Sequence, residues 1–156
     1  MRRNPAVFAI LVGGLIAATL DITYAISFSA WRGVPPTRLL QSVASGLLGS
    51  ASYEGGTATA VLGLILHYLM ALLIAAIFYF ASRRLTFLTR NPITWGALYG
   101  IVVYAVMNLV VIPLSAFPHQ LKFVPIVVTT GLLVHMFCIG VPISLATRRA
   151  SLATSA

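Results

Sequence analysis

Acidic residues are almost absent from this chain, since Asp21 and Glu54 are the only two among 156 residues. Charged residues of both signs make up 8% of the sequence, whereas a soluble domain has roughly 25%. Hydrolysis by paired carboxylates would have to use these two acids together, and we do not expect it. Hydrophobic residues reach 60%, and the mean hydropathy is +1.00. This composition predicts an integral membrane protein without a separate soluble domain.

Cysteine and enzyme motifs are similarly scarce. Cys138 is the single cysteine, so an intramolecular disulfide is excluded. The sequence contains no Gly-x-Ser-x-Gly elbow, no phosphate-binding loop, no His-Glu-x-x-His and no Cys-x-x-Cys, and we expect no enzymatic activity. The net charge of +8 does not indicate nucleic acid, because the ten cations lie in ones, twos and threes between apolar runs. We interpret them as topology signals and contacts for anionic lipid.

Four apolar runs are long enough to cross a bilayer core, which needs about 20 helical residues. They cover residues 6–30, 56–82, 92–112 and 122–147, and we expect one transmembrane domain over 1–156. The first run follows Arg2 and Arg3, as in a signal peptide, but it exceeds an apolar signal core of about 7–15 residues. We therefore expect a retained helix.

A shorter segment, 35–50, has apolar residues at helical spacing and a polar opposite face. It predicts an amphipathic helix that lies in the outer interface or dips into the membrane, with a surface helix favoured over a gate or lid.

The cations predict the orientation of the four spans. Seven lie on one side and three on the other: Arg2, Arg3, Arg83, Arg84, Arg90, Arg148 and Arg149 against Arg32, Arg38 and Lys122. By the positive-inside rule, both termini are expected to be cytoplasmic.

The two halves of the chain resemble each other. Asn-Pro at 4–5 recurs at 91–92, and Asp21 and Asn108 lie at equal distances after those asparagines. "GLILH" at 63–67 matches "GLLVH" at 131–135, with the segment 35–50 as an insertion in the first half. We predict two parallel two-helix repeats related by an axis along the membrane normal. Asp21 would then face Asn108 across that axis, and His67 would face His135.

The candidate site is a polar cleft open to the outer side. Its expected members are Asp21, Asn108, His67, His135, Tyr24, Tyr104 and Glu54. An ionisable group inside a membrane is a functional candidate, so Asp21 indicates a proton, cation or ligand site, or else an interhelical hydrogen-bond clasp with Asn108. His67 and His135 are interpreted as packed core imidazoles, as a pair of axial haem or metal ligands, or as a proton relay or ligand contact.

The stretches "TLDITYA", "RLLQSVASGLLG", "LHYLMALLIAAIFYFASRR" and "YAVMNLVVIPLSA" carry a resemblance over nearly the whole chain. It is to small bacterial four-helix integral membrane proteins of unknown function, and it implies the bacterial inner membrane.

The fold predicted from all these observations is an all-α bundle of four transmembrane helices plus a short outer amphipathic helix. Its leading predicted function is to bind or pass a small ligand, ion or lipid, as a homo-oligomer. The alternative is an accessory protein that packs against a larger membrane complex, and a third possibility is a membrane protein that binds b-type haem.

Overall fold

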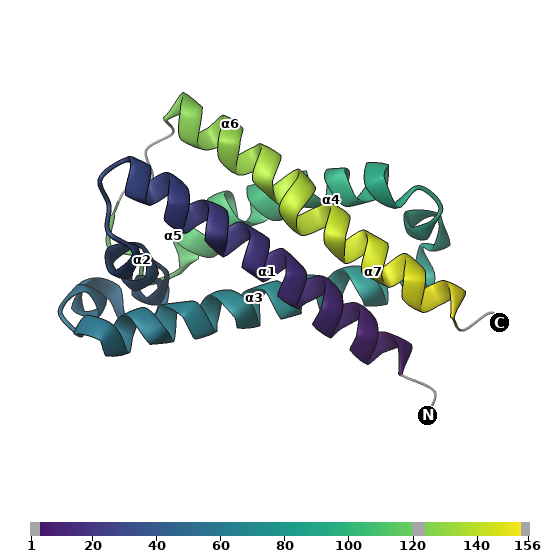
Figure 1. Ribbon diagram of the computed structural model, residues 1–156, viewed down its shortest axis with the longest axis horizontal. Coiled ribbons are helices and arrows are strands. Elements are labelled where there is room, and N and C mark those ends of the chain that lie inside the picture. The colour runs from purple at the N-terminus through teal and green to yellow at the C-terminus, as the bar shows by residue number, and fades with distance from the viewer. Residues whose placement is uncertain (1–3, 120–123, 154–156) are drawn as a thin grey trace.

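The computed structural model describes residues 4–119 and 124–153, which form helices joined by short turns, with no strand in these two ranges (Figure 1). Four helices are long and apolar enough to cross a membrane: Pro5–Trp31, Gly56–Arg84, Pro92–Leu114 and Pro125–Leu152. By length and composition the chain is therefore a multi-pass, all-α membrane protein, as predicted. Arg2, Arg3 and Lys122, which entered the orientation argument, lie outside the described residues.

The first half consists of two uninterrupted spans with a short helix between them. These are α1 (Pro5–Trp31), α2 (Pro36–Leu48), the 3₁₀ turn η1 (Gly49–Tyr53) and α3 (Gly56–Arg84). Asn4 caps α1, because its Oδ1 accepts a hydrogen bond from the Ala6 amide at 3.0 Å. The helix α2 lies within the predicted segment 35–50 and packs along α3. There the Gln41 amide donates to the Gly56 carbonyl at 3.0 Å.

The spans of the second half are interrupted by wider π-helical turns. After the 3₁₀ turn η2 (Thr86–Thr89), the third span consists of α4 (Pro92–Val106), the π segment η3 (Met107–Val111) and α5 (Ile112–Leu114). The fourth consists of α6 (Pro125–Val134), the π segment η4 (His135–Gly140) and α7 (Val141–Leu152). Proline lacks an amide hydrogen and clashes with the carbonyl four residues earlier. Pro113 and Pro142 each lie two residues after the end of a π segment, and this explains where the regular helix is lost.

The bundle order places α1 between α3 and α7, while α4 packs on η4 and α7. Among the described residues, α1 and α4 share few contacts, so the first and third spans lie apart, as the repeat hypothesis expects. Both ends of the chain lie at one end of the molecule and α2 lies at the other (Figure 1). These are called the termini end and the α2 end. The repeat itself stays a prediction, because only the second-half spans contain π turns in the described residues.

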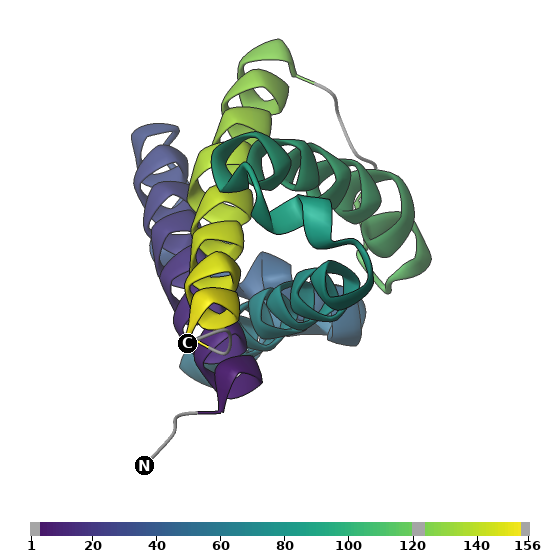
Figure 2. The ribbon, with the colours of Figure 1, turned by 90° about the vertical axis from the view of Figure 1, so that its right-hand side faces the viewer.

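The spans α1, α3 and α7 pack closely toward the termini end, whereas at the α2 end the closest packing is that of α2 on α3. Gly13 and Gly14 let α1 approach α7 and α3, where an added Cβ would lie 3.2 Å from the Cα atoms of Ile143 and Leu72. The last buried residue of α1 is Ile22, and α6 has none among its described residues. Figures 1 and 2 show α6 projecting away from α3 at this end. The packed half therefore ends close to Asp21.

Candidate functional site

Three ionisable side chains from three different spans meet at Asp21. Oδ2 of Asp21 on α1 lies 3.9 Å from Nε2 of His67 on α3, and Oδ1 lies 4.0 Å from Nδ1 of His135 at the start of η4. The side chains are 16%, 15% and 19% exposed, in the order Asp21, His67 and His135. We call this group the Asp–His cluster. It is enclosed by the bundle but not sealed.

The helices place these side chains at the same depth. The stretches 5–21, 67–84 and 135–152 connect the three residues to the termini end and are nearly equal in length. Because a helix rises about 1.5 Å per residue, equal lengths bring the three groups to one level. The close approach of α4 to η4 fixes His135 in addition, since a Cβ on Gly100 would overlap the carbonyl oxygen of His135.

Both imidazoles are oriented by backbone carbonyls. Nε2 of His67 lies 3.0 Å from the Ala18 oxygen, and Nδ1 of His135 lies 2.9 Å from the Gly131 oxygen. A carbonyl oxygen only accepts hydrogen bonds, so each of these nitrogens carries a proton and donates it. The remaining nitrogen of a neutral imidazole, Nδ1 of His67 or Nε2 of His135, is then an acceptor.

The Asp21 carboxylate has no direct hydrogen-bond donor within the described part of the chain. Its separations from the two imidazoles exceed the usual limit of about 3.2 Å for N–H···O bonds. A spacing near 4 Å suits groups that are bridged by a small molecule or that close up when a proton or ligand binds. The cluster can therefore hold or exchange a proton, or accept hydrogen bonds from a donor that enters between the helices.

Two other predicted members, Tyr104 and Asn108, lie on the third span, and Tyr104 contacts His135. The Tyr104 ring packs edge-on against the His135 ring, with centroids 5.2 Å apart. Asn108 lies in η3, and its Nδ2 donates to the backbone carbonyl oxygen of Tyr104 at 2.9 Å. Asn108 thus binds its own helix, and the described residues show no hydrogen bond between Asn108 and Asp21. In both π segments, a polar side chain near the first residue bonds a carbonyl four residues earlier, as His135 does with Gly131.

Tyr24 and Glu54, the remaining predicted members, lie outside the Asp–His cluster. Tyr24 follows Asp21 by one turn on α1 and stacks on Phe28 with centroids 5.4 Å apart. Its hydroxyl is buried and has no hydrogen-bond partner among the residues that the structure describes. Glu54 is exposed in the turn before α3, about three helical turns from His67. The structure therefore does not bring Glu54 into contact with the Asp–His cluster.

The geometry does not favour a metal or haem site at this point. Within residues 4–119 and 124–153, no three His, Cys, Asp or Glu side chains are arranged to hold a metal ion. Nε2 of His67 donates to Ala18 and so offers no lone pair to iron.

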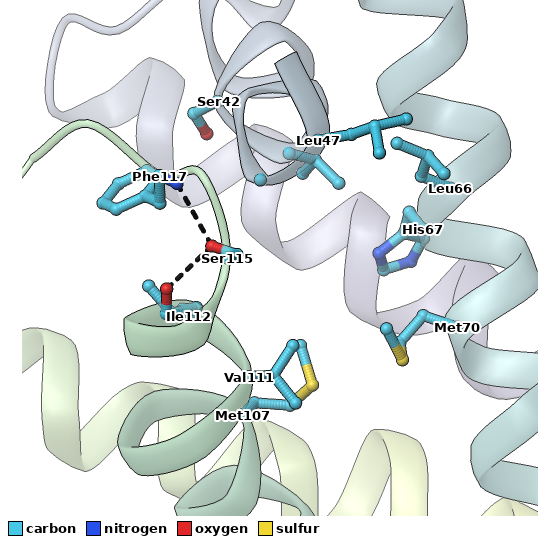
Figure 3. Close-up of a pocket in the computed structure, with 12 residues that line it drawn as sticks. Ser42, Leu47, Leu66, His67, Met70, Met107, Val111, Ile112, Ser115 and Phe117 are labelled. Atoms are coloured by element: carbon cyan, nitrogen blue, oxygen red, sulfur yellow. Dashed lines mark hydrogen bonds between the residues drawn. The ribbon is translucent and has the colours of Figure 1, made fainter. Parts of the chain in front are cut away.

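A cavity of about 460 Å³ adjoins the cluster through His67 (Figure 3). Its walls come from α2, α3 and the segment from η3 to Phe117, so it occupies the α2 end between the second and third spans. Sequence reasoning missed wall residues such as Met70, Met107 and Ser115. The signal available was Pro113, because a proline inside a span predicts a distorted helix that diverges from its neighbour.

Comparison with protein-family models, with curated proteins and with solved structures finds no match to this chain. The interpretation of the site therefore depends on its own geometry.

Proposed function

We propose that this protein binds, and passes across part of the bilayer, a small ligand or ion at an intramembrane cleft centred on the Asp–His cluster. The observation that carries the proposal is one carboxylate with imidazole nitrogens at 3.9 and 4.0 Å, contributed by three separate spans. The tight packing of the termini end and the divergence of α6 support a cleft that opens at the α2 end. By the charge distribution, that end faces outward.

An ionisable group at this depth is expensive in a membrane. Insertion of Asp at the centre of a span costs about 2.5–3.5 kcal/mol, so such residues face a bundle interior or a watery cleft and serve proton or ligand sites. A clasp made only for packing would place the carboxylate within hydrogen-bond distance of its partner. Asp21 instead stands beyond that distance from both histidines, which supports a site that accommodates an additional group.

Native mass spectrometry of the protein released from nanodiscs tests the proposal. We expect a reproducible additional mass on the wild-type chain and its loss in Asp21→Asn. The matched control is Thr23→Val, which removes a polar group from the exposed side of α1 near Asp21. Retention of the mass in Asp21→Asn would contradict a role for the carboxylate. A bare chain or bare oligomer in the wild type would contradict the binding function.

A second candidate function, that of an accessory protein in a larger membrane complex, is favoured by one observation. The described part of α6 has no buried residue, and the third span is buried over only 11% of its apolar window. Gly96 and Gly140 do not contribute to such a surface, because they let α4 pack directly against η4 within the chain. The partner surface would therefore be α6 and α4. In this case Asp21→Asn would be tolerated, whereas Leu133→Ser on α6 would abolish co-purification.

The further parts of the proposal concern location and assembly. We place the protein in the bacterial inner membrane with both termini cytoplasmic, as a homo-oligomer, consistent with the resemblance to small bacterial four-helix membrane proteins. Binding of haem b by His67 and His135 is the third candidate, and it requires a Soret band in protein from haem-replete cells. The bond from Nε2 of His67 to Ala18 favours the Asp–His cluster over this candidate.

A further inference from the structure

The cavity beside His67 is of the size that small ligands occupy. Its volume is about 460 Å³, and typical ligand pockets have about 300–1,000 Å³. Side chains such as Val43, Leu66, Met70 and Ile112 make it predominantly apolar. It is partly open to its surroundings, and its walls include parts of α3 and of the third span, both long and apolar enough to cross a membrane. A molecule can therefore enter it at the level of these spans.

The cavity exists because the second and third spans are in contact near the termini end and diverge toward the α2 end. There Tyr99 of α4 donates to the Ile74 oxygen of α3 at 2.7 Å, and the Tyr99 ring lies 4.8 Å from that of Phe78. Toward the α2 end the π turn η3 and Pro113 redirect the third span. The helix α2 closes the opposite side, because Gly63 admits the Leu40 backbone directly onto α3.

Flexible side chains form the wall nearest His67. Figure 3 shows Met70 and Met107 on opposite sides of the space, with the His67 ring directed into it. Methionine side chains are unbranched and polarisable, and they adapt to apolar ligands of varied shape. The wall is therefore suited to a flexible chain.

The polar side chains of the cavity are available to a ligand as acceptors, because both serine hydroxyls already donate their protons within the chain. The Ser115 hydroxyl donates to the Ile112 oxygen at 2.7 Å and accepts from the Phe117 amide at 3.2 Å, and the Ser42 hydroxyl donates to Leu39 at 2.6 Å. No hydrogen bond reaches Nδ1 of His67 from the described residues. Since Nε2 carries the proton, Nδ1 offers a lone pair, and a ligand must donate to it.

We infer that the cavity binds a lipid-like molecule with one hydroxyl group, a long-chain alcohol or phenol, whose O–H donates to Nδ1 of His67. Its chain occupies the apolar space between Met70 and Met107. A carboxylate head group is disfavoured, because it has no proton to donate to Nδ1 of His67. The inference rests on the proposed function, since it names the ligand class for the cleft that the Asp–His cluster closes.

Photolabelling tests this inference with hexadecanol carrying a diazirine in its chain. The purified protein is reconstituted in phosphatidylcholine nanodiscs, irradiated and mapped by mass spectrometry. We expect labels on Met70 and Met107, displaced by unlabelled hexadecanol. The matching diazirine hexadecyl methyl ether cannot donate a hydrogen bond and should label about three- to tenfold less, as expected for one neutral hydrogen bond. Equal labelling by the alcohol and the ether would overturn the role of His67.

Two variants separate the cavity from the bilayer surface. Met107→Trp fills the space and should abolish labelling at Met70, whereas Leu69→Trp, at a position 56% exposed on α3, should leave it unchanged. His67→Phe should remove the preference for the alcohol over the ether. Labelling that persists in Met107→Trp, or that spreads over the exposed faces of α3, would overturn the inference.

The Asp21→Asn variant distinguishes this inference from the proposed function. If Met107→Trp abolishes the labelling of Met70 but Asp21→Asn leaves the labelling unchanged, the cavity site stands and the role of the Asp21 carboxylate in binding fails. If native spectra show a bound mass that Asp21→Asn removes while neither probe labels the cavity, the proposed function stands and the hydroxyl ligand is wrong.

Discussion

Oδ2 of Asp21 lies 3.9 Å from Nε2 of His67, and the same nitrogen donates a hydrogen bond to Ala18, one turn before Asp21 on α1. His67 therefore holds the two helices together and presents its proton beside the carboxylate at the same time. The same ring also lines the cavity (Figure 3). This arrangement links a ligand hydroxyl at Nδ1 with Asp21 through a single imidazole ring.

The crossing of α4 and η4 should be intolerant of any side chain at Gly100. In Gly100→Ala, the new Cβ would overlap the His135 carbonyl and lie 2.5 Å from the Cα atom of Met136. We expect a loss of about 1–3 kcal/mol in the free energy of unfolding, measured in detergent micelles. The matched control is Gly46→Ala on α2, whose Cβ would find its nearest atom, Ser115 Oγ, at 3.7 Å. Equal stability of the two variants would contradict this packing.

Two tyrosine hydroxyls should respond in opposite ways to removal. The Tyr99 hydroxyl donates to the Ile74 oxygen at 2.7 Å, so Tyr99→Phe should lower the free energy of unfolding by about 0.5–1.5 kcal/mol. The buried Tyr24 hydroxyl has no hydrogen-bond partner in the described part of the chain, and Tyr24→Phe should leave the stability unchanged or raise it. Thermal unfolding in one detergent measures both. A loss in Tyr24→Phe comparable to that in Tyr99→Phe would show that the Tyr24 hydroxyl is bonded to a group from outside the chain.

Hydropathy alone was sufficient to predict the four spans, because a run of apolar residues long enough to cross a bilayer has few alternatives to a helix. The partner of Asp21 was not predictable in the same way. Symmetry between Asp21 and Asn108 favoured a contact across the axis, but Asn108 bonds to Tyr104 within its own span. The rotation of each helix about its axis decides which side chains meet. It depends on close backbone approaches such as that of Gly100 to His135, and the sequence shows these only as isolated glycines.

Some of the missing information was present as spacing. Asp21, His67 and His135 lie at similar distances along their helices from the termini end, and this equality predicts a common level without any appeal to the repeat. Pro113 and Pro142 likewise mark the π turns. The cavity requires more, since its walls join α2 with the third span, and their positions depend on tertiary packing.

Labelling of single cysteines tests the orientation of the spans. In a Cys138→Ala background, Thr37→Cys on α2 and Thr86→Cys in η2 place exposed thiols at opposite ends of the bundle. A membrane-impermeant maleimide should label Thr37→Cys in intact cells and Thr86→Cys only after permeabilisation, because the positive-inside rule predicts that the arginine-rich termini end is cytoplasmic. The reverse pattern would invert the proposed orientation.

A double-mutant cycle measures whether Asp21 and His67 act as a unit. Asp21→Asn and His67→Gln remove the carboxylate and the imidazole with little change in size, and the free energies of unfolding of both single variants and the double variant are compared in the same micelles. Because the two groups are in contact, we expect a coupling of about 0.5–3 kcal/mol, so that the double variant loses less stability than the sum of the single losses.

The control pair is Asp21→Asn with Tyr99→Phe. The hydrogen-bond partner of Tyr99, Ile74, lies about two turns from His67 along α3, so the two effects should be additive within about 0.5 kcal/mol. Additivity in both pairs would mean that the carboxylate and the imidazole are neighbours without interaction, and a relay from the cavity to Asp21 would then be excluded. Coupling confined to the Asp21–His67 pair would make His67 the group through which an occupant of the cavity influences the carboxylate.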